Sequence, residues 1–152
     1  MRKVKFIDLF AGIGGIRKGF EMAFSKCGFQ TECVFTSEIK PHAIKVLNAN
    51  HPDETIYGDI TTIAASDLPD FDFLLAGFPC QAFSYAGRRL GFQDTRGTLF
   101  FEVERIIKEK NPCGFILENV EGLVTHDREN PNDSIGRTLT VILSKLNELG
   151  YH

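Results

Sequence analysis

The chain has 152 residues, 43% of them hydrophobic, and a formal net charge of −3. This length suits one domain with a sizeable core, and no apolar run approaches the roughly 20 residues that a membrane-spanning helix needs. The N-terminus enters a strand pattern without a signal peptide, so we expect a cytoplasmic protein. The acidic balance disfavours a self-sufficient DNA-binding domain, because such domains usually carry a basic face.

The first half of the chain alternates strand and helix patterns. An apolar run over residues 4–10 predicts the first strand, and a glycine-rich turn leads into a helix that ends at Gly28. Residues 31–37 form the second predicted strand, Pro41 opens the next helix at its first position, and a short third strand falls within residues 56–60. The residues expected to face the core from these two helices are Ile16, Phe20, Ala23, Phe24, Ala43, Ile44 and Leu47.

The second half continues the alternation. Residues 71–76 read as a buried strand, and a strongly amphipathic helix follows and stops at Asn111. Residues 113–117 form the fifth predicted strand, and a last helix is closed by Gly150. The apolar positions that define these two helices are Leu99, Phe100, Val103, Ile106, Ile107, Leu139, Ile142, Leu143, Leu146 and Leu149.

Alternating strands and helices of these lengths predict an α/β fold with a doubly wound, mostly parallel sheet. The pattern stops after a helix, at Tyr151 and His152, where another strand is due. We therefore expect the sheet to be incomplete at its C-terminal strands.

The four cysteines do not indicate a metal site. None belongs to a CxxC pair, and no histidine stands at zinc-finger spacing. Reduced thiols in a cytoplasmic protein fit best. Cys27, Cys33 and Cys113 sit beside apolar residues, so we expect them in or near the core.

The turn after the first strand indicates a close approach between backbone and ligand. Gly12, Gly14 and Gly15 remove side chains where the strand meets the helix, whose N-terminus offers free N–H groups. Arg17 stands where a dinucleotide fingerprint requires its third glycine, so that fingerprint is disfavoured. Taken alone, such a turn is weak evidence, because glycine-rich turns often serve packing only.

Two acids follow the next two predicted strands. Glu38 lies after the second strand, 26 positions after Gly12 (38 − 12). An acid in this place accepts hydrogen bonds from ribose hydroxyls in many α/β enzymes, although an exposed acid near a helix start is an equal alternative. Asp59, after the third strand, is a candidate for the adenine amino group or a turn residue that follows Gly58.

One cysteine stands at the end of a predicted buried strand. The run of residues 71–76 is followed by a Gly/Pro break, with Pro79 and Cys80 directly after it. Open parallel sheets bind ligands at the carboxyl ends of their strands, which places Cys80 where a ligand would bind. Without other motifs, a buried structural cysteine is the commoner case.

A local basic cluster follows this cysteine. Between residues 81 and 97, three arginines, Arg88, Arg89 and Arg96, stand against a single acid, Asp94. Composition alone leaves two interpretations open, a solvated loop and a phosphate contact.

Several segments together resemble the cytosine-5 DNA methyltransferase family. They are FIDLFAGIGG at residues 6–15, PCQ at residues 79–81, TRGTLF at residues 95–100 and ENV at residues 118–120. The similarity covers essentially all 152 residues in order. Within the family, the chain most resembles the small bacterial restriction–modification enzymes.

The resemblance implies a Rossmann-like methyltransferase fold with S-adenosylmethionine (AdoMet) as the cofactor. In the family's motifs, the phenylalanine contacts the adenine, an acid binds the ribose and an acid–isoleucine pair contacts the adenine. The residues that the resemblance assigns to the cofactor are Asp8, Phe10, Ala11, Gly12, Gly14, Gly15, Glu38, Ile39, Asp59, Ile60, Pro79 and Leu99.

The resemblance also implies the chemistry. A thiolate that adds to C6 of cytosine makes C5 nucleophilic, and this role falls to Cys80. Glu118 is expected to hydrogen-bond or protonate N3, in an acid form that burial at the sheet edge favours. Asn119 is expected to orient the pyrimidine or the loop.

The implied partner is double-stranded DNA with the target cytosine flipped out of the stack. The loop that begins at residue 81 is expected to close over the DNA. The residues implied to contact DNA or shape this loop are Gln81, Ser84, Arg88, Arg89 and Arg96.

The family pattern continues beyond these residues with a target-recognition domain and further C-terminal motifs. We therefore expect residues 1–152 to form the AdoMet-binding and catalytic domain, inactive alone, of a truncated chain or of a split enzyme. A C-terminal half or a partner subunit would supply the rest. Two alternatives remain open: an RNA cytosine-5 methyltransferase, and an inactive AdoMet-fold subunit. The intact Cys80, Gln81 and Glu118 argue against the inactive subunit.

Overall fold

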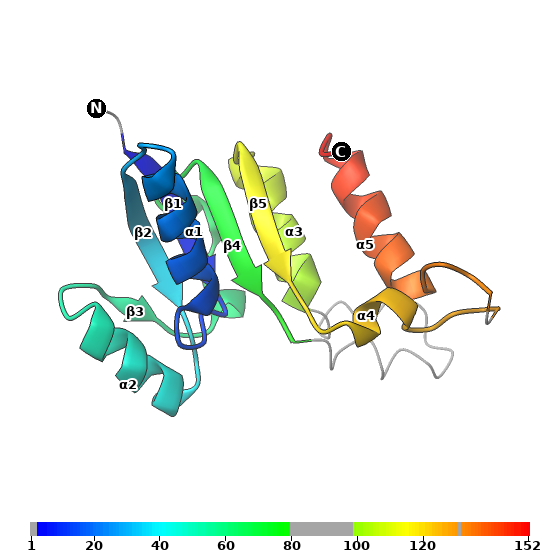
Figure 1. Ribbon diagram of the computed structural model, residues 1–152, viewed down its shortest axis with the longest axis horizontal. Coiled ribbons are helices and arrows are strands. Elements are labelled where there is room, and N and C mark those ends of the chain that lie inside the picture. The colour runs from blue at the N-terminus through cyan, green and yellow to red at the C-terminus, as the bar shows by residue number, and fades with distance from the viewer. Residues whose placement is uncertain (1–2, 80–98, 131) are drawn as a thin grey trace. The chain divides into compact units, whose positions relative to one another are not determined.

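The computed structural model describes residues 3–79, 99–130 and 132–152 (Figure 1). The contacts divide the chain into two compact units, which are described separately. The sheet unit consists of Met1–Phe78 and Glu109–Glu118, and the helical unit of Pro79–Lys108 and Asn119–His152. The elements in chain order are β1 (Val4–Leu9), α1 (Gly15–Lys26), β2 (Thr31–Ser37), α2 (Pro41–Asn50), β3 (Ile56–Tyr57), the 3₁₀ turns η1 (Ile60–Thr62) and η2 (Ala65–Asp67), β4 (Phe73–Gly77), α3 (Leu99–Lys110), β5 (Gly114–Glu118), α4 (Gly122–Thr125) and α5 (Arg137–Glu148).

The sheet unit holds one sheet with the strand order β3-β2-β1-β4-β5. Every neighbouring pair of strands is parallel, as the arrows in Figure 1 show. This confirms the predicted parallel α/β sheet. The chain order runs outward from β1 through β2 to β3, and then resumes on the other side of β1 with β4 and β5. In open parallel sheets, ligands bind at the carboxyl ends of the strands beside such a reversal.

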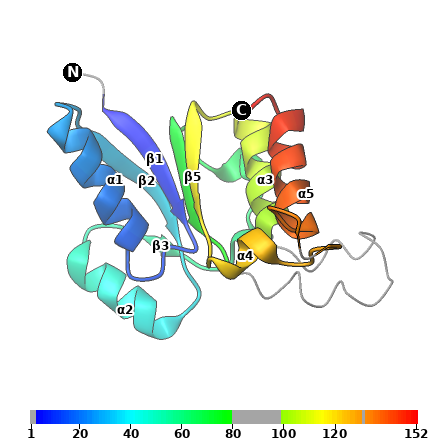
Figure 2. The ribbon, with the colours of Figure 1, turned by 45° about the vertical axis from the view of Figure 1, so that its right-hand side comes forward.

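The core of the sheet unit lies around β1. Phe6, Ile7 and Leu9 are fully buried, as a continuous apolar run in a central parallel strand predicts. Helix α1 packs along one face of the sheet (Figure 2). The ring centroids of Phe6 and Phe20 are 4.9 Å apart. Phe20 also lies 4.3 Å from the ring of Phe24, centroid to centroid. Burial of these large rings holds α1 against the sheet.

Two predictions about burial in the sheet unit were wrong. Ala23, which was expected to face the core, is exposed. The buried residues of α1 are Arg17 and Phe20, and Ala23, six residues beyond Arg17, points away from the face that they form. Cys27 and Cys113 are exposed, since Cys27 follows the last residue of α1 and Cys113 precedes β5. The third cysteine expected near the core, Cys33, is half-buried.

The strand boundaries also shift by one or two residues. β1 ends at Leu9 because Phe10 has a φ of 54°, outside the extended region. β4 begins at Phe73 and not at residue 71, since the side chain of Asp72 accepts a hydrogen bond from Lys5 N at 2.9 Å. The third strand contains only the two residues of β3.

In the helical unit, α4 and α5 are joined by a closed loop. His126 Nδ1 lies 2.8 Å from Thr138 Oγ1, and Gly136 N donates to Val124 O at 2.7 Å, so the two ends of the loop meet. Helix α4 lies in a stretch for which the sequence predicted neither helix nor strand.

Burial along α5 follows a four-residue spacing. Thr138, Ile142 and Leu146 are its buried residues, and one turn of helix separates each from the next. Leu143, one of the apolar positions that define this helix in the sequence, is 45% exposed. Because successive residues of a helix point in different directions, the residue directly after Ile142 lies outside the narrow buried stripe.

Candidate functional site

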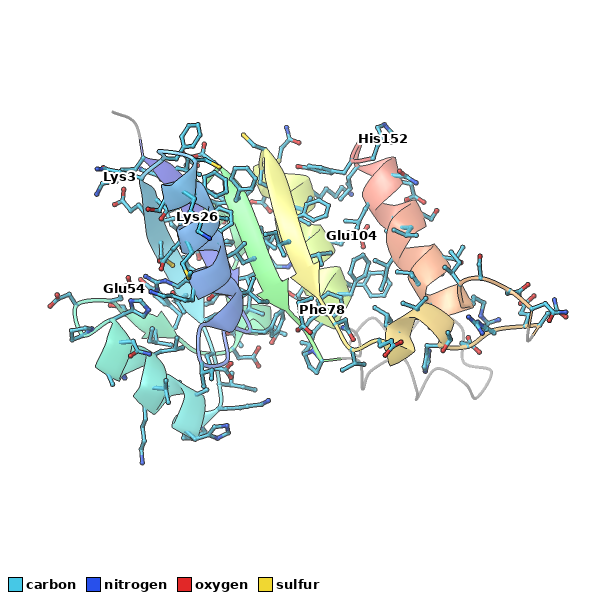
Figure 3. All side chains as sticks on the ribbon, in the orientation of Figure 1. Lys3, Lys26, Glu54, Phe78, Glu104 and His152 are labelled. Atoms are coloured by element: carbon cyan, nitrogen blue, oxygen red, sulfur yellow. The ribbon has the colours of Figure 1, made fainter. Side chains whose placement is uncertain are left out.

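The carboxyl ends of the five strands meet at one edge of the sheet unit. β1 is followed by Phe10, β2 by Glu38 and β4 by Phe78, which Figure 3 labels at this edge. Asp59 comes two residues after β3, and Glu118 is the last residue of β5. The acids and the glycine turn that the sequence analysis named as candidate site residues come from separate segments, and the fold brings them to one edge of the sheet.

The turn from β1 to α1 runs through left-handed backbone. The φ angle is 54° at Phe10, 56° at Gly12 and 87° at Gly14. This conformation costs a non-glycine residue about 1–2 kcal/mol, and Phe10 is held in it while Ala11 N donates to Ser37 O at 3.0 Å. Backbone strain of this kind clusters at ligand sites, where the surrounding structure enforces it.

The space over this turn is open. A Cβ atom added at Gly12 or at Gly15 would meet no atom within 4 Å. Ile13 and Ile39 are each 64% exposed, one on the turn and one directly after Glu38. The turn therefore offers bare backbone at a helix N-terminus, with apolar side chains beside it, as a nucleoside-type ligand requires.

Glu38 is a buried acid held by backbone donors. It is 6% exposed, and its Oε2 accepts from Gly12 N at 2.7 Å. Its Oε1 accepts from Ile39 N and from Lys40 N, both at 2.8 Å. The Glu38 N–H donates to Tyr57 O at 2.9 Å. The residue thus ties the glycine turn of β1 to the ends of β2 and β3.

These bonds leave little of the Glu38 carboxylate for a ligand. A carboxylate has about four acceptor positions, and three are occupied by backbone N–H groups. One position on Oε2 remains, which suits a single hydroxyl donor. The contact with a ribose hydroxyl stays a prediction, and the structure adds a second role for Glu38 in shaping the turn.

Asp8 lies beneath the turn, inside β1. It is 1% exposed, and neither carboxyl oxygen has a hydrogen-bond partner among the described residues. Burial raises the pKa of Asp8 from 3.8 to about 7, while the nearby Arg17 guanidinium lowers it. Two residues from Phe6, Asp8 shares with it the face of β1 that α1 covers. A buried carboxyl without a partner calls for a hydrogen-bonding group from a ligand or from solvent, so the residues around the turn fit a cofactor that carries hydrogen-bond donors, as AdoMet does.

Asp59 and Ile60 follow β3 at the same edge. Asp59 Oδ1 accepts from Thr61 N at 2.9 Å and so caps the turn η1. The side chain of Asp59 is exposed, whereas Ile60 is 2% exposed and belongs to the core. Their predicted contacts with adenine remain predictions.

Glu118 ends β5 beside the glycine that ends β4. A Cβ atom on Gly77 would lie 3.2 Å from Glu118 Oε2 and 3.1 Å from Ile16 Cδ1. Gly77 therefore gives the Glu118 carboxylate room against β4, a role that the sequence analysis missed. Its signal was a glycine directly after a buried strand. The described residues leave Glu118 exposed, so they do not supply the burial that we expected to favour its acid form.

The remaining predicted residues are distributed as follows. Pro79 is exposed, Leu99 is the half-buried first residue of α3, and Asn119 Oδ1 accepts from Val120 N at 2.9 Å. The residues that lie outside the described ranges are Cys80, Gln81, Ser84, Arg88, Arg89 and Arg96.

The structure also reveals an ion pair that the sequence analysis did not predict. Arg17 is 4% exposed, and its Nη1 and Nη2 donate to the two carboxylate oxygens of Glu54 at 2.6 and 2.7 Å. Its Nε donates to Glu21 Oε1 at 2.9 Å. The available signal was an arginine near the core-facing stripe of an amphipathic helix, where a charge requires a partner.

Residues 3–79, 99–130 and 132–152 contain neither a metal-binding cluster nor a membrane-spanning helix. No group of three or more His, Cys, Asp or Glu side chains in these ranges is placed to hold a metal ion. None of the helices in them combines the length and the apolar character that a membrane crossing demands.

A parallel α/β sheet with a glycine turn after β1 and a buried acid at the end of β2 defines a class of cofactor-binding enzyme domains. Within this class, the family model of C-5 cytosine-specific DNA methylases matches residues 4–152. The chain therefore belongs to the C-5 cytosine-specific DNA methylase family, which confirms the resemblance carried by its motifs.

Curated relatives align along the whole chain. It is 68% identical over 152 residues to the Type II methyltransferases M.NlaIV of Neisseria lactamica and M.NgoBV of Neisseria gonorrhoeae. It is 58% identical over 149 residues to the Type II methyltransferase M.BanI of Aneurinibacillus aneurinilyticus. These alignments cover 98–100% of this chain but only 32–36% of the relatives, so the chain spans about a third of their length.

Solved structures share the fold. A mutant of Spodoptera frugiperda DNMT2 superposes with a TM-score of 0.68 at 24% identity, over 97% of this chain and 41% of that protein. The S. pombe Dnmt2 methyltransferase superposes with a TM-score of 0.64 at 20% identity, over 97% of this chain and 40% of that protein. At these identities the likeness concerns the fold alone.

Proposed function

We propose that this chain is the cofactor-binding and catalytic part of a DNA cytosine-5 methyltransferase from a Type II restriction–modification system. The observation that carries the proposal is 68% identity, along all 152 residues, to two Type II methyltransferases. The complete enzyme would combine this part with a C-terminal half, or with a partner subunit, that reads the DNA sequence.

The carboxyl edge of the sheet would hold AdoMet, which supplies the methyl group when bound. Glu38 has one acceptor position left for a ribose hydroxyl, and Ile39 beside it offers an exposed apolar side chain. The first N–H groups of α1, which begins at Gly15 directly after the turn, would face this ligand. The buried carboxyl of Asp8, which has no partner among the described residues, would offer hydrogen-bonding oxygens behind the turn.

Cys80 would be the nucleophile. Its Sγ forms a bond to C6 of a flipped cytosine, and the ring electrons move toward N3 and C5. Glu118 would stabilise this charge by donating a hydrogen bond or a proton to N3, and Gly77 keeps space for its carboxylate. After C5 has received the methyl group and lost its proton, the bond between C6 and Sγ breaks and the thiolate is released.

The test is methyl transfer by the complete enzyme. Tritiated AdoMet is offered with genomic DNA in one reaction and with total cellular RNA in another. The proposal expects label in DNA, and loss of label with Cys80→Ala. On DNA that carries 5-fluorocytosine, the wild-type enzyme should form a covalent adduct and Cys80→Ala should form none. Label in RNA alone would replace the proposal with the RNA methyltransferase alternative, and an adduct with Cys80→Ala would exclude Cys80 as the nucleophile.

A further inference from the structure

Arg17 is a buried charge on the inner side of α1. Its guanidinium makes a two-pronged contact with the Glu54 carboxylate, at 2.6 and 2.7 Å, and lies 5.8 Å from the centroid of the Phe6 ring. Such forked pairs are the strongest and most directional ion pairs that proteins make. Arg17 is buried and Glu54 is half-buried. An ion pair withdrawn from water in this way adds little net stability compared with apolar residues, and its best-attested use is to fix a specific arrangement.

Glu54 joins this charge to the edge of the sheet. It lies two residues before β3, in the segment between α2 and β3 where Figure 3 labels it. β3 has only two residues, which pair with Thr36 and Ser37 of β2. So short an edge strand has few ladder bonds of its own. The Arg17–Glu54 pair therefore anchors β3 to α1.

β3 in turn supports the acid of the predicted ribose site. Tyr57 O accepts the N–H of Glu38 at 2.9 Å, and the Glu38 carboxylate holds Gly12 N at 2.7 Å. Gly12 lies in the turn that leads into α1, which carries Arg17. The contacts form a closed ring from Arg17 through Glu54, β3, Glu38 and the glycine turn back to α1.

We propose that Arg17 and Glu54 are positioning residues for the cofactor site, whose ion pair fixes β3 and thereby the carboxylate of Glu38. Neither residue needs to touch the cofactor for this effect. The inference rests on the proposed function, because it takes Glu38 to be a cofactor ligand.

Glu21 provides a matched control for Glu54. Both acids accept hydrogen bonds from Arg17, but Glu21 lies on α1 itself, four residues further along. Glu54→Gln and Glu21→Gln each replace one carboxylate partner of the same arginine by an amide of nearly the same size. Only Glu54→Gln weakens the link to β3. Arg17→Lys is the second test variant, because it keeps the positive charge and removes the forked contact.

Two measurements on the complete enzyme separate positioning from general damage. Isothermal titration with AdoMet should show the dissociation constant rising about tenfold in Glu54→Gln and in Arg17→Lys. The reason is that a smaller fraction of the molecules would have β3 and Glu38 in the conformation that binds AdoMet. Turnover at saturating AdoMet should stay within about twofold of wild type. Glu21→Gln should match wild type in both.

Hydrogen exchange without any ligand supplies the second readout. The amide of Glu38, which donates to Tyr57 O, and the amide of Gly12 should exchange faster in Glu54→Gln than in Glu21→Gln. Equal protection of these amides in both variants would overturn the inference, as would a fall in turnover with unchanged affinity. A wild-type enzyme that binds no AdoMet would refute the proposed function, while the exchange rates still decide whether the pair fixes β3.

Discussion

The buried carboxyl of Asp8 makes a prediction about stability against pH. Its pKa is raised from 3.8 to about 7 by burial. Between these two values the folded chain keeps the proton that the unfolded chain has lost. The unfolded state therefore binds fewer protons, and the free energy of unfolding falls as the pH rises through this interval. Asp8→Asn removes the titration and keeps the shape of the side chain.

The size of the effect follows from the shift. A raised pKa of about three units corresponds to about 4 kcal/mol in total, of which about 2.5 kcal/mol falls between pH 5 and pH 8. The unfolding free energy of Asp8→Asn should therefore rise relative to wild type by about 2.5 kcal/mol over that range. Any constant cost of burying the amide shifts all points equally and does not change this slope.

Urea unfolding followed by circular dichroism at pH 5, 6, 7 and 8 measures this difference. Asp53→Asn, an exposed acid between α2 and β3, corrects for the loss of one negative charge. A difference between Asp8→Asn and wild type that stays constant with pH would show that Asp8 is ionised in the folded chain throughout. The reasoning from burial would then be wrong.

Four further predictions concern the edge of the sheet and the chain as a whole. Gly77→Ala places a Cβ atom 3.1 Å from Ile16 Cδ1 and 3.2 Å from Glu118 Oε2, so both side chains must shift, and it should destabilise the fold by about 1 kcal/mol, measured by urea unfolding; unchanged stability would show that both side chains move aside freely. Glu38→Gln should lower the free energy of unfolding by about 1–3 kcal/mol, because the NH₂ group of the amide cannot accept the hydrogen bonds that a carboxylate oxygen accepts. It should also weaken AdoMet binding in calorimetry, and an unchanged affinity would leave Glu38 a structural residue only. Glu118→Gln should remove about 2–4 kcal/mol of transition-state stabilisation, and so lower the turnover of the complete enzyme, with little change in AdoMet affinity. Equal losses in turnover and in AdoMet affinity would make Glu118 structural. Residues 1–152 alone, with a net charge of −3, should transfer no tritiated methyl to DNA, and sequence-specific methylation by them would contradict this.

The sequence predicted the site best where a local rule sufficed. The glycines of the β1–α1 turn follow from the need for left-handed backbone, which Gly12 and Gly14 adopt. The place of Glu38 follows from its position after a predicted strand, because parallel strands bring their carboxyl ends to one edge. The parallel sheet itself follows from the alternation of strand and helix patterns, and five predicted strands are present.

Relations between distant residues came only from the tertiary structure. Arg17 and Glu54 are 37 positions apart in the sequence, and no periodicity of the sequence pairs them. Their contact depends on how α1 packs on the sheet and on where the segment after α2 returns. The same packing decides that Asp8 is buried with no hydrogen-bond partner in the described part of the chain and that Glu118 lies exposed beside Gly77. Sequence patterns report which residue types a local element accepts, whereas burial, pKa and ion pairing depend on neighbours that folding brings together.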